Sequence, residues 1–117
     1  MYFKPAIAVL GLLCISSLGC ATASQEKPVW LDERIAQMKK NPPGNPPFSI
    51  WQYRYQGRNV YYFPPQCCDI PSTLLDAKQN ALCSPDGGFA GDGDGKCTDF
   101  FTTRSEEKLI WRDSRSR

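Results

Sequence analysis

The stretch SIWQYRYQGRNVYYF, residues 49–63, decides the fold of this chain of 117 residues. Its aromatic residues Trp51, Tyr53 and Tyr55 alternate with polar residues, which is the period-two pattern of a half-buried strand. Gly57 follows at the point where the chain would reverse into a second apolar segment. The stretch therefore predicts a β-hairpin.

A helix is predicted on the N-terminal side of this hairpin, in PVWLDERIAQMKK (residues 28–40). Leu31, Ile35 and Met38 are spaced so that they form one apolar stripe on a helix. The next segment, NPPGNPPF (residues 41–48), cannot extend the helix, because proline lacks an N–H donor and pushes the residue before it to extended geometry. We therefore expect a short amphipathic helix followed by a stiff connector.

Two segments on the C-terminal side of the hairpin favour further strands. STLLDAKQNALC (residues 72–83) has leucines on both sides of a polar turn, and EKLIWRD (residues 107–113) is apolar between charged ends. One helix followed by antiparallel strands predicts an α+β fold, with the N-terminal amphipathic helix packed on a small antiparallel sheet. We expect a single domain over residues 28–113, followed by a basic tail at residues 114–117.

The aromatic residues of the hairpin are assigned to two faces of the sheet. We expect Trp51, Tyr53 and Tyr55 to lie in the core beneath the helix. Tyr61 and Tyr62 then remain as a candidate contact surface, because tyrosine combines a large apolar area with a polar hydroxyl group.

The N-terminus has the pattern of a targeting segment. Lys4 precedes an apolar run, residues 5–19, that is too short to span a bilayer and is followed by small residues. SLGC, which ends at Cys20, resembles a bacterial lipoprotein box, whereas ATA (residues 21–23) suits ordinary secretory cleavage. We expect a signal peptide of residues 1–19, or of residues 1–23 with the second site, and a polar tether over residues 20–27.

This segment predicts an extracytoplasmic protein. If Cys20 is lipidated, the chain is anchored to the cell membrane and faces the periplasm or the exterior. With the alternative cleavage site, the mature chain is a secreted or periplasmic soluble protein.

The cysteines of the mature domain form an even set, which is typical of disulfides in an oxidising compartment. The four are Cys67, Cys68, Cys83 and Cys97. Adjacent cysteines rarely bridge each other, because the usual separation of the two Cα atoms cannot be met. We therefore expect two disulfides, either 67 to 83 with 68 to 97 or the crossed alternative.

The acidic loop CSPDGGFAGDGDGKC (residues 83–97) raises the question of a metal site. The candidate calcium ligands are Asp86, Asp92, Asp94 and Asp99. Counted from Asp92, an EF-hand loop would need an oxygen ligand at its fifth position, which is Lys96. We favour a disulfide-tethered turn without a metal over a calcium loop of another kind.

The order of these motifs resembles a family of small exported bacterial proteins, many of them lipoproteins, catalogued as a domain of unknown function. The residues that carry the resemblance are YRYQGRNVYYFPPQCCD, LLDAKQNALCSPDGG and GDGDGKCTDF, within residues 28–113. The resemblance implies one extracytoplasmic domain and transfers no activity, cofactor or catalytic residue.

Composition narrows the function further. The net charge of +2 is too small to indicate a nucleic-acid partner, and the chain contains no histidine, the commonest general base. We expect a non-enzymatic binding or inhibitor-like module of the cell envelope that binds an envelope protein or ligand and needs no cofactor. The alternatives are a calcium-binding structural domain and an enzyme that uses the aspartates of residues 83–97.

Overall fold

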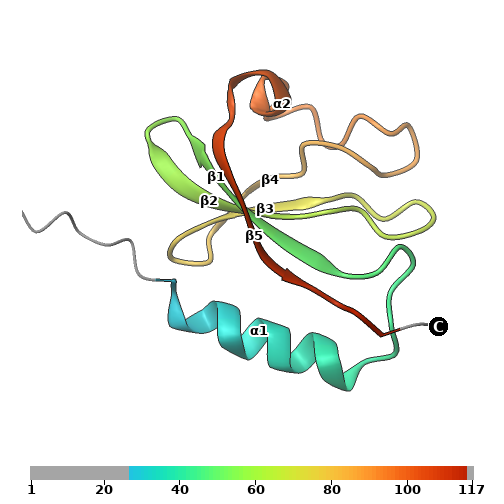
Figure 1. The fold of residues 1–117 in the computed structure, drawn as a ribbon. Coiled ribbons are helices and arrows are strands. Elements are labelled where there is room, and N and C mark those ends of the chain that lie inside the picture. The colour runs from blue at the N-terminus through green and yellow to red at the C-terminus, as the bar shows by residue number, and fades with distance from the viewer. Residues whose placement is uncertain (1–26, 116–117) are drawn as a thin grey trace, which may run out of the picture.

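The computed structural model describes residues 27–115 and shows two helices and one antiparallel sheet (Figure 1). The helices are α1 (Val29–Lys40) and α2 (Phe100–Thr103). The strands are β1 (Ser49–Tyr55), β2 (Arg58–Phe63), β3 (Thr73–Asp76), β4 (Ala81–Cys83) and β5 (Ser105–Arg112). Their order across the sheet is β4-β3-β2-β1-β5. The predicted α+β fold is confirmed.

The predicted hairpin is β1 and β2, which pair antiparallel with Trp51 opposite Tyr62 and Tyr53 opposite Val60. Its two-residue turn has positive φ at Gln56 and at Gly57, as the tight turns that suit a twisted hairpin require. Directly opposite residues share a face of the sheet, so this register decides which side chains meet on each side.

One face of the sheet, here called the helix face, is covered by α1, which runs below the strands in Figure 1. The buried residues of this face are Leu31, Ile50, Tyr61, Phe63 and Leu75. Leu31 and the partly buried Ile35 and Met38 belong to the predicted helix stripe, which is confirmed.

The opposite face, here called the loop face, is covered by α2 and by the chain that leads to it from β4 (Figure 1). Its buried residues are Tyr53, Tyr55, Val60, Tyr62, Leu74, Cys83 and Phe100. Phe100 has no exposed surface, and its ring meets the rings of Tyr53 and Tyr55 edge-on at 5.5 and 5.3 Å between centroids. The prediction that Trp51, Tyr53 and Tyr55 lie beneath the N-terminal helix is therefore wrong. Tyr53 and Tyr55 pack against Phe100 of α2, and the partly buried Trp51 packs against the same loop-face cluster.

The disulfides pair differently from both predicted arrangements. Cys67 is bonded to Cys68, and Cys83 is bonded to Cys97. Cys83 lies in the core of the loop face, whereas the adjacent pair is exposed in the connection between β2 and β3. The prediction relied on the usual separation of bridged Cα atoms; here the two Cα atoms lie 2.9 Å apart, and the peptide bond between them is cis.

Arg115, which lies in the predicted basic tail, contacts the end of α1. Its guanidinium donates to the carbonyls of Lys39 and Met38 at 2.9 and 3.2 Å and pairs with the buried Asp113 at 2.7 Å. The cation thereby binds carbonyls at the C-terminus of α1, where that of Met38 also accepts from the amide of Asn41. Residues 116 and 117 lie outside the described part of the chain.

Candidate functional site

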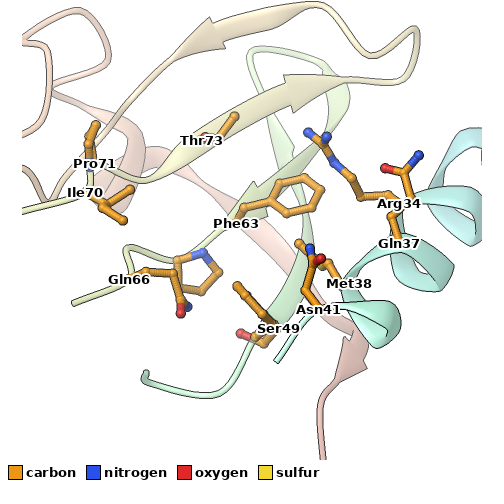
Figure 2. Close-up of a pocket in the computed structure, with 12 residues that line it drawn as sticks. Arg34, Gln37, Met38, Asn41, Ser49, Phe63, Gln66, Ile70, Pro71 and Thr73 are labelled. Carbon is orange, nitrogen blue, oxygen red and sulfur yellow. The ribbon is translucent and has the colours of Figure 1, made fainter. Parts of the chain in front are cut away.

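A groove lies between α1 and the connection from β2 to β3, with a cavity volume of about 300 Å³ (Figure 2). We call it the α1 groove. Its lining residues are Arg34, Gln37, Met38, Asn41, Phe48, Ser49, Phe63, Pro64, Gln66, Ile70, Pro71 and Thr73. Figure 2 shows Arg34 and Gln37 coming from α1 on one side, Ile70 and Pro71 on the other, and Phe63 between them.

The helical period places three of these residues on one side of α1, and a fourth follows directly after its end. Arg34, Gln37 and Met38 follow at intervals of three and one residues, which brings them to one face of a helix. Asn41 follows the last helical residue, where the prolines of the connector prevent another turn. The end of α1 thus forms one wall of the α1 groove.

Beside the groove, the connector is held to the chain that follows β2. The amide of Asn45 donates to Gln66 Oε1 at 2.9 Å, and the amide of Cys67 donates back to the carbonyl of Asn45 at 2.6 Å. Gly44 permits this contact, because a Cβ there would collide with the side chain of Gln66. Both loops are therefore held together beside the cavity.

Arg34 is the most unusual residue of the groove. Its guanidinium carbon lies 5.4 Å from the ring centroid of Phe63, so the cation packs over an aromatic face. Its Nε is buried and has no hydrogen-bond partner among the residues that the structure describes. A buried N–H without an acceptor is uncommon in proteins and requires an explanation.

The groove suits binding better than acid–base chemistry. Its lining contains one cation, three side-chain amides, two hydroxyls and six apolar residues, and it contains no carboxylate or cysteine. One of the hydroxyls, that of Ser49, already accepts a hydrogen bond from Trp51 Nε1 at 3.1 Å. No lining side chain can therefore act as an ordinary general base near neutral pH.

The predicted calcium ligands lie on the loop face, away from the groove, and most of them accept hydrogen bonds from the protein itself. Asp86 Oδ1 accepts from the hydroxyl of Tyr62 at 2.7 Å, and Asp99 Oδ1 accepts from that of Tyr55 at 2.6 Å. Asp94 accepts from the amides of Ser84 and Lys96, each at 3.0 Å. The carboxylates face different donors instead of one common centre.

Asp92 is exposed, and a backbone bridge joins it to Gly87. Between residues 27 and 115, no three acidic or cysteine side chains are grouped so that they could hold a metal ion. The disulfide from Cys83 to Cys97 closes the acidic loop, and the hydrogen bonds of Asp94 fold it inward. This geometry favours the disulfide-tethered turn.

The candidate contact surface of Tyr61 and Tyr62 needs correction. The two side chains are 1% and 7% exposed, because Tyr61 packs against Trp30 of α1 and Tyr62 packs against Phe100. Adjacent residues of a strand point to opposite faces, and both faces of this sheet are covered. Neither tyrosine is available to a partner.

Burial changes the acidity of the loop-face tyrosines. Burial and the hydrogen bond to Glu107 raise the pKa of Tyr53 to about 12, and the hydrogen bond to Asp99 followed by burial raises the pKa of Tyr55 to about 12. Burial, together with the hydrogen bond to Asp86, also raises the pKa of Tyr62. These hydroxyls stay protonated donors at every physiological pH.

The sequence analysis missed the α1 groove, although two weak signals pointed to it. Arg34 lies three residues after Leu31 and four before Met38, so the sequence places a cation on the border of the apolar stripe. Ile70 is an isolated apolar residue in a polar connection, and its side chain is 55% exposed. Both residues line the groove, which forms between segments far apart in the chain.

The fold and the groove define a small disulfide-linked α+β domain. The chain belongs to the family of the domain of unknown function DUF6970, whose model matches residues 36–113. The predicted membership of a family of unknown function is thereby confirmed. The match includes every lining residue of the groove except Arg34. No curated protein and no solved structure matches the chain.

The predicted signal peptide and the lipidation site Cys20 lie outside residues 27–115 and stay predictions. Within the described range, neither helix is long and apolar enough to cross a bilayer.

Proposed function

We propose that this protein is an exported, non-enzymatic binding module whose ligand occupies the α1 groove. The observation that carries the proposal is the partly buried guanidinium of Arg34, which lines a cavity of about 300 Å³ and has no ion pair among residues 27–115. A ligand with an acceptor group would give this guanidinium, through its Nη groups, the partner that it lacks. The cavity size lies at the lower end of the range for small-molecule sites.

Export is supported by the N-terminal sequence and by the disulfides. Residues 1–19 have the pattern of a signal peptide, and two disulfides suit an oxidising compartment. Lipidation of Cys20 would tether the domain to the membrane through residues 20–27 and leave the α1 groove open to extracytoplasmic ligands.

The groove is tested by filling it. Gln37→Trp places an indole in the groove, whereas Ala36→Trp places the same side chain on an exposed helix position that does not line the groove. We would export both variants and the wild type in the full-length form, purify them and identify bound small molecules by native mass spectrometry. We expect the wild type and Ala36→Trp to carry the same ligand and Gln37→Trp to lose it. Equal loading of all three proteins would refute the proposed site.

The anchor is tested independently of the groove. We expect the wild-type chain to fractionate with membranes and a Cys20→Ala variant to become soluble or to stay uncleaved. Recovery of the wild type in the soluble extracytoplasmic fraction, with Ser24 as its first residue, would show that ordinary secretion is correct.

A further inference from the structure

Arg34 supplies the only full charge in the lining of the α1 groove, because none of the other eleven lining residues is ionisable. No ion pair between residues 27 and 115 includes it. Asp32, which precedes it on α1, is paired with Lys27 at 2.7 Å. The groove therefore has an uncompensated positive charge, which attracts an anion.

From this geometry we propose that the ligand is a small carboxylic acid with an apolar body, and that its carboxylate binds Arg34. The inference rests on the function proposed above and specifies its ligand class. The two Nη groups of a guanidinium present N–H donors side by side, and this fork matches the two oxygens of a carboxylate. Packing over Phe63 at 5.4 Å holds the cation in place, so less freedom is lost when the acid binds.

The rest of the lining selects the remainder of the ligand. Met38, Phe48, Phe63, Ile70 and the two lining prolines form apolar walls that favour a hydrocarbon or aromatic body. The amides of Gln37, Asn41 and Gln66 are neutral and can orient a polar substituent but cannot compensate a second charge. A phosphate dianion would bury charge that a single guanidinium cannot neutralise, so a monoanion fits better.

The inference is tested with two probes of nearly the same shape, 3-phenylpropionate and its neutral amide, 3-phenylpropanamide. Apart from Met1, Met38 is the only methionine of the chain, so a ¹³C-methyl methionine label reports on the groove alone. We would titrate each probe into the exported, disulfide-bonded protein at pH 7 and low salt and follow the Met38 methyl signal. We expect the acid to bind at least about tenfold more tightly than the amide, because a charge-assisted hydrogen bond replaces a neutral one.

Three variants assign this preference to Arg34. Arg34→Gln should reduce the preference for the acid to about one, Arg34→Lys should keep a part of it, and Lys40→Gln should keep it in full, because Lys40 carries the same charge on the same helix without lining the groove. Circular dichroism would confirm that each variant is folded.

The outcomes separate the two proposals. Equal shifts by acid and amide would overturn the carboxylate inference while leaving the groove as a binding site, and so would an acid preference that survives in Arg34→Gln. No shift of Met38 with either probe at 10 mM, which is about ten thousand times a micromolar Kd, would overturn both proposals. Tighter binding of inorganic phosphate than of 3-phenylpropionate would show that the groove selects multivalent anions.

Discussion

The two faces of the sheet differ in whether their buried donors find hydrogen-bond acceptors in the protein. On the loop face, the hydroxyls of Tyr53, Tyr55 and Tyr62 donate to carboxylates at 2.7, 2.6 and 2.7 Å. On the helix face, the α1 groove contains a cation, and its Nε finds no acceptor within residues 27–115. The three tyrosine hydroxyls of the loop face have acceptors within the protein, whereas the buried Nε of the helix face has none within residues 27–115.

This difference explains why the acidic residues are a poor guide to function here. The density of aspartates in residues 83–97 suggests a metal site, yet Asp86 and Asp94 are occupied by donors of the protein. A single unpaired arginine is less visible in a sequence and is the stronger indication of a ligand. Counting charged residues therefore matters less than finding which of them are satisfied.

The largest expected difference in the free energy of unfolding is between variants that lack one disulfide and variants that lack the other. Cys83 and Cys97 are separated by 14 residues, and removing this bond with Cys83→Ala and Cys97→Ala should lower the free energy of unfolding by about 3 kcal/mol, because the unfolded chain gains freedom. Cys67→Ser with Cys68→Ser should cost less than about 1 kcal/mol, because no intervening chain is released. Denaturant unfolding measures both values.

Equal losses in the two double variants would contradict this part of the comparison. They would show that the loop face gains no special stability from its disulfide.

Substitutions of the two neighbouring tyrosines of β2 compare the stability of the two faces directly. Tyr62→Phe removes a partly buried hydrogen bond to Asp86 and should cost about 2 kcal/mol, as for other bonds to charged groups. Tyr61→Phe is the matched control on the helix face and should cost less than about 0.5 kcal/mol, because its hydroxyl has no hydrogen bond within residues 27–115. Thermal and denaturant unfolding of both variants would measure the difference, and similar costs would show that the hydroxyl of Tyr62 contributes little.

The smallest expected change in the free energy of unfolding comes from the raised pKa values of the tyrosines, and it appears only at alkaline pH. Tyr53 and Tyr55 have pKa values of about 12 in the fold and 10.0 when unperturbed, so the unfolded chain releases their protons first as pH rises. This contribution to stability is complete below pH 10 and is lost between about pH 10 and 12. We expect the free energy of unfolding to fall across this window.

The double variant Tyr53→Phe with Tyr55→Phe provides the control for the alkaline transition. It should be less stable at pH 7, because two hydrogen bonds are lost, and its stability should fall less steeply above pH 10. An unchanged slope would assign the alkaline loss to other groups.

The sequence by itself determined the local elements of this protein. The period of the apolar residues located α1, and the alternation around Gly57 located the hairpin, because these patterns reflect how side chains project from a helix or a strand. Prolines in residues 41–48 fixed the end of α1. The family of the domain could likewise be recognised from its motifs.

Only the tertiary structure decided how these elements meet. The alternation of the hairpin separates two faces but does not indicate which one the helix covers, and so Tyr53 and Tyr55 were placed beneath the wrong element. Pairing of Cys83 with Cys97 and the approach of Arg34 to Phe63 join residues whose distance in space no local pattern specifies. The candidate site was hidden for the same physical reason, because a groove forms from packing between segments that are far apart in the chain.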